Sequence, residues 1–136
     1  DPETQSILPL VEGDLLGALW GAAVGELDVE LAVGDGAAVT VVLAGSDYPA
    51  RSDSGTPIAG LEDAEAIGAL VFHAGTARHG ERLVTNGGRI LNVTAIADDL
   101  AGARDAAYEA VAKIVFDGMQ LRRDIALTAA EGHVHS

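Results

Sequence analysis

Two short segments of this sequence carry groups suited to binding an anion, and the first is Asn86-Gly87-Gly88-Arg89. It stands at the expected entrance of a strand, where a turn presents backbone N–H groups and the guanidinium of Arg89 adds donors for phosphate or carboxylate oxygens. Asn-Gly turns also occur in many hairpins for conformational reasons alone. By themselves these residues give only a weak indication of an anion site.

The second segment, Arg122-Arg123-Asp124, places two guanidinium groups side by side in a chain that has few of them. Neighbouring side chains of a strand point to opposite faces, so one arginine could meet a ligand while the other pairs with a carboxylate. With so many acidic residues in the chain, an ordinary ion pair is the simpler interpretation.

The remaining polar residues have simpler structural explanations. His73, in His73-Ala74-Gly75-Thr76, ends an expected strand and points away from the face of Leu70 and Phe72, which is typical of a structural histidine. No carboxylate, serine or cysteine stands at a spacing that completes a familiar catalytic set. We therefore predict no catalytic residue in this chain.

Charged groups near the two ends of the sequence are also ambiguous. Asp1 and Glu3 could reach a metal–nucleotide site just upstream, but capping of a helix explains both carboxylates. His133 and His135 could hold a metal, but a flexible tail explains them better. The sequence predicts no metal site and leaves the roles of the two histidines open.

The composition limits the partners of the chain. Eight Lys and Arg stand against 21 Asp and Glu, and the formal net charge of -13 excludes nucleic acid as a partner. A small phosphorylated metabolite is still compatible, because local arginines act within a screening length of about 8 Å. The sequence has no cysteine and no apolar run near the roughly 20 residues of a membrane span. We expect a cytoplasmic protein with no membrane partner.

The elements that must position these residues begin with a helix over residues 1–25. Its apolar residues recur at helical spacing: Leu8, Val11, Leu15, Leu16 and Leu19. Pro9 is expected to bend this helix or delay its start, and Gly25 to end it. Residues 26–35 are expected to form a linker, because Gly34-Asp35-Gly36 is the clearest hinge in the chain.

Strands dominate the rest of the chain. The valine-rich run 37–44 is typical of a strand covered on both sides, and further strands are expected at residues 70–73, 82–85 and 89–97. Exposed turns are expected at residues 76–80 and 86–88, the second with positive φ.

The last predicted elements are a helix and an edge strand. Asp98-Asp99 should cap the helix, Gly118 should end it, and residues 119–125 should form the strand. Strands next to strands, followed by a helix, predict an α+β fold with a largely antiparallel sheet and one long helix.

Several segments, in this order and spacing, resemble the C-terminal part of the phosphoribosylamine–glycine ligase family, also called glycinamide ribonucleotide synthetases. The resemblance covers Asp1 to about Ile125 and rests on these segments: Asp1-Pro2-Glu3-Thr4-Gln5, Asp47-Tyr48-Pro49, Val71-Phe72-His73-Ala74-Gly75-Thr76, Leu83-Val84-Thr85-Asn86-Gly87-Gly88-Arg89-Ile90-Leu91 and Arg122-Arg123-Asp124-Ile125. Ala50 and Ala126 depart from the family, which usually has glycine at both positions.

The resemblance implies an ATP-grasp enzyme of purine biosynthesis that joins glycine to phosphoribosylamine, with ATP and Mg as cofactors. It implies that residues 1–25 are the last helix of the ATP-grasp domain and 26–35 a linker. Residues 36–126 would be a C-terminal domain similar to a rudiment single hybrid motif, and 127–136 a flexible tail. The ATP-binding residues would lie upstream of Asp1 in a missing N-terminal part of the same polypeptide, so this piece would be inactive alone, and the intact enzyme would be a monomer.

The resemblance also implies roles for the two candidate segments. Asn86, Gly87, Gly88 and Arg89, with Arg122 or Arg123, would face the ribose phosphate of phosphoribosylamine. Asp1, Glu3, His73, Gly75 and Thr76 would lie near the active site. Two alternatives stay open: a free-standing acidic binding module that uses the same domain, and a different ATP-grasp ligase.

Overall fold

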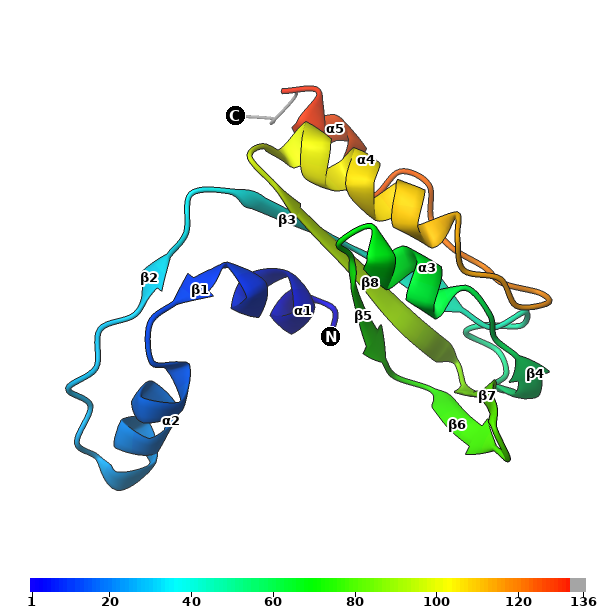
Figure 1. Cartoon of the computed structure of the whole chain (residues 1–136), viewed down its shortest axis with the longest axis horizontal. Helices are drawn as coiled ribbons and strands as arrows, with labels where there is room; N and C mark the ends of the chain where they lie inside the picture. The colour runs from blue at the N-terminus through cyan, green and yellow to red at the C-terminus, as the bar shows by residue number, and fades with distance from the viewer. Residues whose placement is uncertain (133–136) are drawn as a thin grey trace.

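The valine-rich run and the longest predicted strand pair with each other, as expected of apolar stretches that are covered on both faces (Figure 1). In the computed structural model, which describes residues 1–132, β8 (Arg89–Ala97) lies between β3 (Ala37–Ala44) and β5 (Leu70–His73), antiparallel to both. All three strands were predicted at these bounds. The candidate residues His133 and His135 lie outside the described part.

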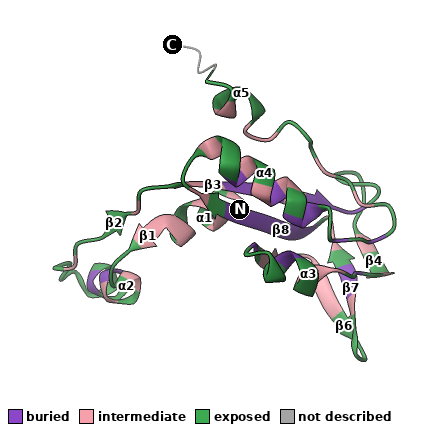
Figure 2. Cartoon of the chain, turned by 45° about the horizontal axis from the view of Figure 1, so that its top comes forward, coloured by how far each residue is buried: buried purple, intermediate pink, exposed green. Residues whose placement is uncertain are grey.

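One face of this sheet is covered by α4 (Leu100–Val111), which begins where predicted. The Asp99 side chain caps it by accepting a hydrogen bond of 2.7 Å from the Gly102 N–H. Ala103, Ala107 and Ala110 are fully buried against the sheet, and Figure 2 shows the buried residues concentrated on β3, β8 and the inner side of α4. The expected end at Gly118 is wrong, because the helix stops at Val111 and Val115 then pairs with Ala59.

A second antiparallel sheet has the order β4-β7-β6. Its strands are β4 (Asp53–Pro57), β6 (Thr76–His79) and β7 (Arg82–Gly87), and α3 (Leu61–Ala66) follows β4. The predicted turn at 76–80 is therefore wrong: residues 76–79 are a strand, and the turn begins at Gly80, which has a φ of 64°.

The predicted hairpin turn at Asn86-Gly87-Gly88 is also wrong. β7 continues to Gly87 and belongs to the second sheet, whereas β8 begins at Arg89 in the first sheet. Gly87 and Gly88 do not have positive φ. Gly87 is needed for space instead, because a Cβ there would lie 2.8 Å from the Cα of Gly75.

The N-terminal segment is not the single helix that we predicted. It consists of α1 (Glu3–Ile7), a 3-10 turn (Leu8–Leu10), β1 (Val11–Glu12), α2 (Leu15–Val24) and, after a loop, β2 (Ala32–Val33), which pairs with β1. Pro9 lies in the 3-10 turn, and Gly13 has a φ of 108°, which separates the two helices. Gly25 ends α2 in the left-handed conformation, as expected.

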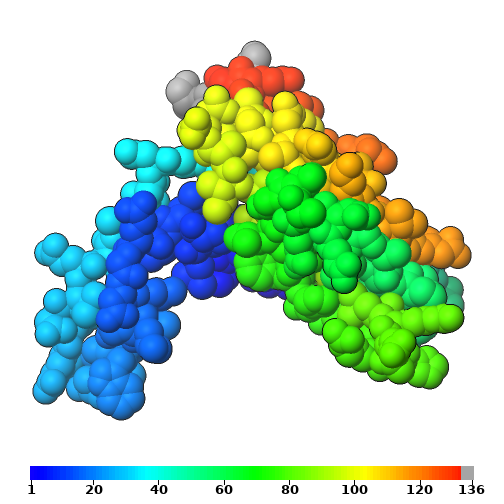
Figure 3. Space-filling model, viewed as in Figure 1, coloured from blue at the N-terminus to red at the C-terminus, as the bar shows by residue number. Residues whose placement is uncertain are grey.

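The two helices of this N-terminal segment differ in their contacts with the rest of the molecule. α1 packs on β3 and β8, on the sheet face opposite α4, while α2 lies out on the projecting arm (Figure 1). Leu16, Leu19 and Trp20 on α2 are 78%, 61% and 70% exposed. Figure 3 shows the molecule hollowed between this arm and the β6–β7 hairpin.

The chain after α4 contains no edge strand at 119–125, contrary to the prediction. Gln120 alone pairs with Ala44, and residues 127–130, predicted to be flexible, form the short helix α5 (Leu127–Ala130), which packs on α4. No helix within residues 1–132 combines the length and apolar character that crossing a membrane requires.

Candidate functional site

A pocket of about 340 Å³ lies where the end of β3, the start of β8 and the chain after α4 meet. This volume is within the range of small-molecule sites. We call it the arginine pocket, and its lining consists of Val42, Ala44, Tyr48, Arg89, Gln120, Leu121 and Arg122. It therefore brings together one arginine from each of the two segments singled out in the sequence.

Ala44 is the point that joins these elements. A β-bulge after Leu43 shifts the register of β3 so that Ala44 pairs with Arg89. On its other side, Ala44 exchanges two backbone hydrogen bonds with Gln120, of 2.8 and 2.9 Å. Arg89 and Gln120 thereby flank the same backbone position, although they are distant in the sequence.

Arg89 is held by the residue that we expected to cap the first helix. Its Nη2 lies 3.1 Å from Oδ2 of Asp1, and its Nη1 donates to the Asp1 carbonyl oxygen at 3.3 Å. No side chain among the described residues caps α1, whose N-cap residue is Pro2, so the predicted capping role of Asp1 is wrong. Glu3 lies on α1 with its carboxylate exposed.

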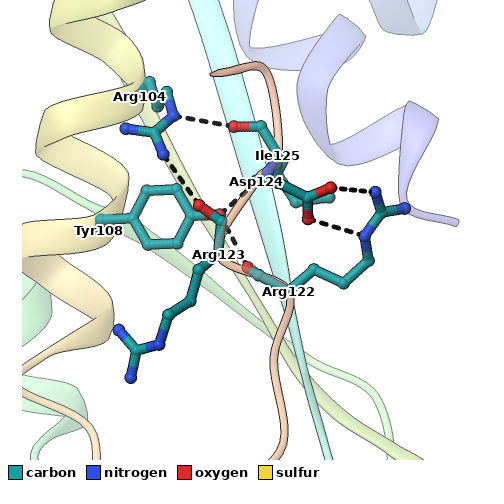
Figure 4. Close-up of polar contacts among 6 residues, drawn as sticks. All are labelled: Arg104, Tyr108, Arg122, Arg123, Asp124 and Ile125. Atoms are coloured by element: carbon teal, nitrogen blue, oxygen red, sulfur yellow. Dashed lines mark hydrogen bonds and ion pairs between the residues drawn. The ribbon is translucent and has the colours of Figure 1, made fainter. Parts of the chain in front are cut away.

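Arg122 is held by a carboxylate in the same way. Its Nε and Nη2 donate to the two carboxylate oxygens of Asp124 at 3.0 and 2.6 Å (Figure 4). This two-pronged contact fixes the plane of the guanidinium. The hydrogen bonds from Arg122 lower the pKa of Asp124, and the same contact raises the pKa of Arg122.

Arg123 does not share the pocket. Figure 4 shows its guanidinium pointing away from the Arg122–Asp124 pair, and within residues 1–132 it makes no ion pair. The side chains of Arg122 and Arg123 thus point in different directions, but the segment is not a strand. The predicted division of roles is wrong, because Arg122 both lines the pocket and pairs with Asp124.

Two residues of α4 fix this segment, and we did not anticipate either. Tyr108 donates a hydrogen bond of 2.7 Å to the Arg122 carbonyl and accepts one of 3.2 Å from the Ile125 N–H. Arg104 donates to the carbonyl oxygens of Arg123 and Ile125 at 2.9 and 3.1 Å, and its guanidinium lies 4.8 Å from the centre of the Tyr108 ring. Their spacing of four residues on one helix was the signal in the sequence.

Asn86, Gly87 and Gly88 do not line the pocket. The Asn86 N–H donates to the Gly75 carbonyl at 2.7 Å, and the Gly75 N–H donates to the Arg89 carbonyl at 2.8 Å. These backbone hydrogen bonds therefore join the two sheets, and one of them ends at the carbonyl oxygen of Arg89. Gly75 belongs to this junction, as does Gly87, which it touches.

His73 and Thr76 lie close to each other, with 3.0 Å between Nδ1 and Oγ1. His73 lines a different and larger pocket of about 540 Å³ between α3 and the β6–β7 hairpin, together with Arg78 and Arg82. The structure thus separates His73 from the arginine pocket.

Tyr48 and Gln120 are lining residues to which we assigned no role from the sequence. Gln120 donates a side-chain hydrogen bond to the carbonyl oxygen of Ser46, which holds the loop after β3 against the pocket. Tyr48 belongs to the Asp47-Tyr48-Pro49 segment that carried the resemblance. Within residues 1–132 there is no group of three or more His, Cys, Asp or Glu side chains that could hold a metal ion.

Comparison with known proteins gives one consistent result. Residues 38–128 match the family described as "Phosphoribosylglycinamide synthetase, C domain". Phosphoribosylamine–glycine ligases from Streptomyces coelicolor and Chlorobaculum tepidum are 50% and 47% identical over 96% and 95% of this chain. The human trifunctional purine biosynthetic protein adenosine-3 is 41% identical over 95% of it and 13% of its own length.

The fold comparison agrees. A crystal structure of phosphoribosylamine–glycine ligase from Thermotoga maritima superimposes with a TM-score of 0.79 at 38% identity, over 93% of this chain and 31% of that one. The chain spans about a third of the length of the two bacterial ligase relatives, 32% and 31%. With two thirds of its residues inside the family match and close relatives over nearly all the rest, the chain belongs to the phosphoribosylglycinamide synthetase C-domain family.

Proposed function

We propose that this chain forms part of a ligase that condenses glycine with phosphoribosylamine, using ATP, to give glycinamide ribonucleotide, ADP and phosphate. Its own contribution is the arginine pocket, which binds the phosphate of phosphoribosylamine. One observation carries this proposal: Arg89 and Arg122, from separate segments, line one pocket of about 340 Å³.

The electrostatics of the pocket suit a phosphate monoester better than the net charge of the chain suggests. A phosphate monoester carries a charge of about -1.5 to -2 at pH 7 and offers several strong acceptor oxygens. Asp1 contacts some of the N–H donors of Arg89, and Asp124 accepts hydrogen bonds from some of those of Arg122, and each contact fixes the orientation of the guanidinium. Within residues 1–132, Nε of Arg89 and Nη1 of Arg122 are left to donate to a ligand.

The carboxylate partners also set the strength of the site. Each guanidinium charge is largely balanced by its own carboxylate, so long-range attraction is weak and short-range hydrogen bonds must supply the binding energy. The pocket is therefore a site for one well-positioned phosphate, and the polyphosphate chain of ATP is assigned elsewhere.

We propose the following division of labour along the chain. Residues 36–126 form the C-terminal domain and carry the pocket, residues 26–35 link it, and residues 1–25 belong to the ATP-grasp domain. The exposed Leu16, Leu19 and Trp20 of α2 support this assignment, because an isolated apolar face of this kind is normally covered.

The described residues offer no metal-ligand cluster that could hold magnesium. We assign the binding of ATP and magnesium to other parts of the ligase. We assign no catalytic residue to this chain and propose that it does not catalyse the reaction alone. The intact enzyme is proposed to be a cytoplasmic monomer.

Titration of the chain with ribose 5-phosphate, followed by the NMR shifts of backbone amides, tests the phosphate assignment. Arg89→Ala and Arg122→Ala should each weaken binding by about tenfold or more, because each removes hydrogen bonds to a charged group. Arg123→Ala is the matched control and should change the affinity less than about twofold. Equal affinities for all four proteins would rule out the arginine pocket as the phosphate site.

A further inference from the structure

Tyr48 is the aromatic side chain of the arginine pocket, and the proposed phosphate contact gives it no role. It lies in the loop after β3 and is 41% exposed, so burial in the core does not explain its position. Its ring lines the same pocket as the two guanidinium groups of Arg89 and Arg122.

The ring of Tyr48 packs closely against Gly88. A Cβ at position 88 would lie 2.9 Å from Cδ2 and 3.2 Å from Cε2 of Tyr48, so a larger residue would push the ring away. Gly88 does not have positive φ, and its conformation alone would admit other residues. The absence of a side chain at position 88 therefore serves the close approach of Tyr48.

The backbone holds the loop in this place. The Gly45 N–H donates to the Gly88 carbonyl at 2.9 Å, and the Tyr48 N–H donates to the Gly45 carbonyl at 3.2 Å. Gly88 is followed directly by Arg89. The loop that carries Tyr48 is thus held beside Gly88, the residue that immediately precedes Arg89.

The remaining lining shows what kind of ligand the pocket suits. Val42, Ala44 and Leu121 contribute apolar groups, and Tyr48 contributes an aromatic ring that carries a hydroxyl. Inorganic phosphate has no apolar group that could pack against this apolar and aromatic lining. The carbon-bound hydrogens of a sugar pack well on an aromatic face, and its hydroxyls can bond to the phenol or to the Gln120 carboxamide.

We propose that Tyr48 is a specificity-determining residue that contacts the sugar attached to the phosphate, so that the pocket distinguishes a sugar phosphate from inorganic phosphate. This inference rests on the proposed function of the arginine pocket. It adds that Gly88 acts as a positioning residue, by leaving room for the ring.

The experiment compares two probes, ribose 5-phosphate and inorganic phosphate, by NMR titration of the same chain. Tyr48→Ala should weaken ribose 5-phosphate binding by about three- to tenfold, the usual strength of an aromatic contact, and change inorganic phosphate binding less than about twofold. Tyr48→Phe should keep most of the preference for the sugar phosphate. Gly88→Ala should act like Tyr48→Ala, because it displaces the ring without removing it.

The possible results separate this inference from the proposed function. If Tyr48→Ala weakens both probes equally, or neither, while Arg89→Ala and Arg122→Ala still weaken binding about tenfold or more, the Tyr48 assignment is wrong and the phosphate pocket stands. If neither arginine variant affects either probe, the phosphate pocket itself is wrong and the Tyr48 assignment fails with it. Since Tyr48 is partly exposed, both of its variants should fold, and an unchanged amide spectrum outside the loop verifies this.

Discussion

Each arginine of the pocket is paired with an aspartate, and this arrangement matters more than the number of positive charges. Asp124 accepts both hydrogen bonds of Arg122, which lower the pKa of its carboxyl. A carboxylate with a lowered pKa contributes stability above its ordinary pKa of about 3.9, and this contribution is lost as the pH falls through the folded-state value. The pair should therefore stay intact between about pH 5 and 8, and any change of phosphate binding in this range should come from the ligand.

Removal of the arginine should release this carboxyl. In Arg122→Gln, the pKa of Asp124 should rise toward its ordinary value, because the hydrogen bonds that favour the charged form are gone. The carboxyl carbon shift of Asp124, followed by NMR as the pH is lowered, measures this. Arg123→Gln should leave the titration unchanged, and a pKa insensitive to Arg122 would mean that the pair does not form in solution.

Gly75 lies where the two sheets meet, and the space there leaves no room for a Cβ atom. A Cβ there would lie 2.6 Å from the Arg89 carbonyl oxygen and 2.7 Å from the Gly87 Cα, and backbone atoms cannot move aside easily. Gly75→Ala should lower the free energy of unfolding by about 1–3 kcal/mol, measured by urea denaturation.

The neighbouring Ala74 provides the control for this prediction, because its side chain is exposed. Ala74→Ser should change the free energy of unfolding by less than about 0.5 kcal/mol. Equal stability of Gly75→Ala and the unmodified chain would show that the two sheets do not meet as closely as described.

At the scale of elements, α4 both completes the core and fixes the Arg122 segment. The Asp99 side chain caps this helix through the Gly102 N–H. Asp99→Ala should cost about 1 kcal/mol of stability in thermal or urea unfolding, the usual effect of losing an N-cap. Asp98→Ala, at the adjacent exposed position, should cost less than about 0.5 kcal/mol, and an equal cost for both would argue against the cap.

The elements that could be predicted from the sequence are those with a strong local signal. The apolar runs at 37–44 and 89–97 admit few alternatives to buried strands, and Asp99 marks the start of α4. The strand β6 (Thr76–His79) was missed because Gly75 and Gly80 flank it and suggest a turn. The break between α1 and α2 depends on the positive φ of Gly13, which an apolar helical pattern conceals.

The candidate site was predictable only in part for a similar reason. Residue chemistry gave only a weak indication of Arg89, Arg122 and Arg123 and did not distinguish the last two. The contact that unites Arg89 with Arg122 runs through Ala44 and Gln120, and no local pattern encodes that pairing. The Asn86-Gly87-Gly88 segment was assigned to the ligand because a turn there would present free backbone N–H groups beside Arg89, as the resemblance also implied. In the structure, these glycines serve close packing against Gly75 and Tyr48.

At the scale of the whole molecule, residues 1–132 contain the arginine pocket and a projecting arm with an exposed apolar helix. Since we assign the nucleotide to other parts of the ligase, this chain should show essentially no tight binding of ADP in the presence of Mg²⁺. Isothermal titration calorimetry measures this, with ribose 5-phosphate as a positive control. Micromolar ADP binding would instead favour the alternative of a free-standing acidic binding module.

The most direct test of the phosphate assignment uses a chimera in which this chain replaces the corresponding part of the Streptomyces coelicolor ligase, which is 50% identical. With steady-state kinetics, Arg89→Ala in the chimera should raise KM for phosphoribosylamine about tenfold or more, since the lost contacts bind the phosphate. KM for glycine and for ATP should change less than about twofold. Equal increases for all three substrates would contradict the assignment of the arginine pocket to the sugar phosphate.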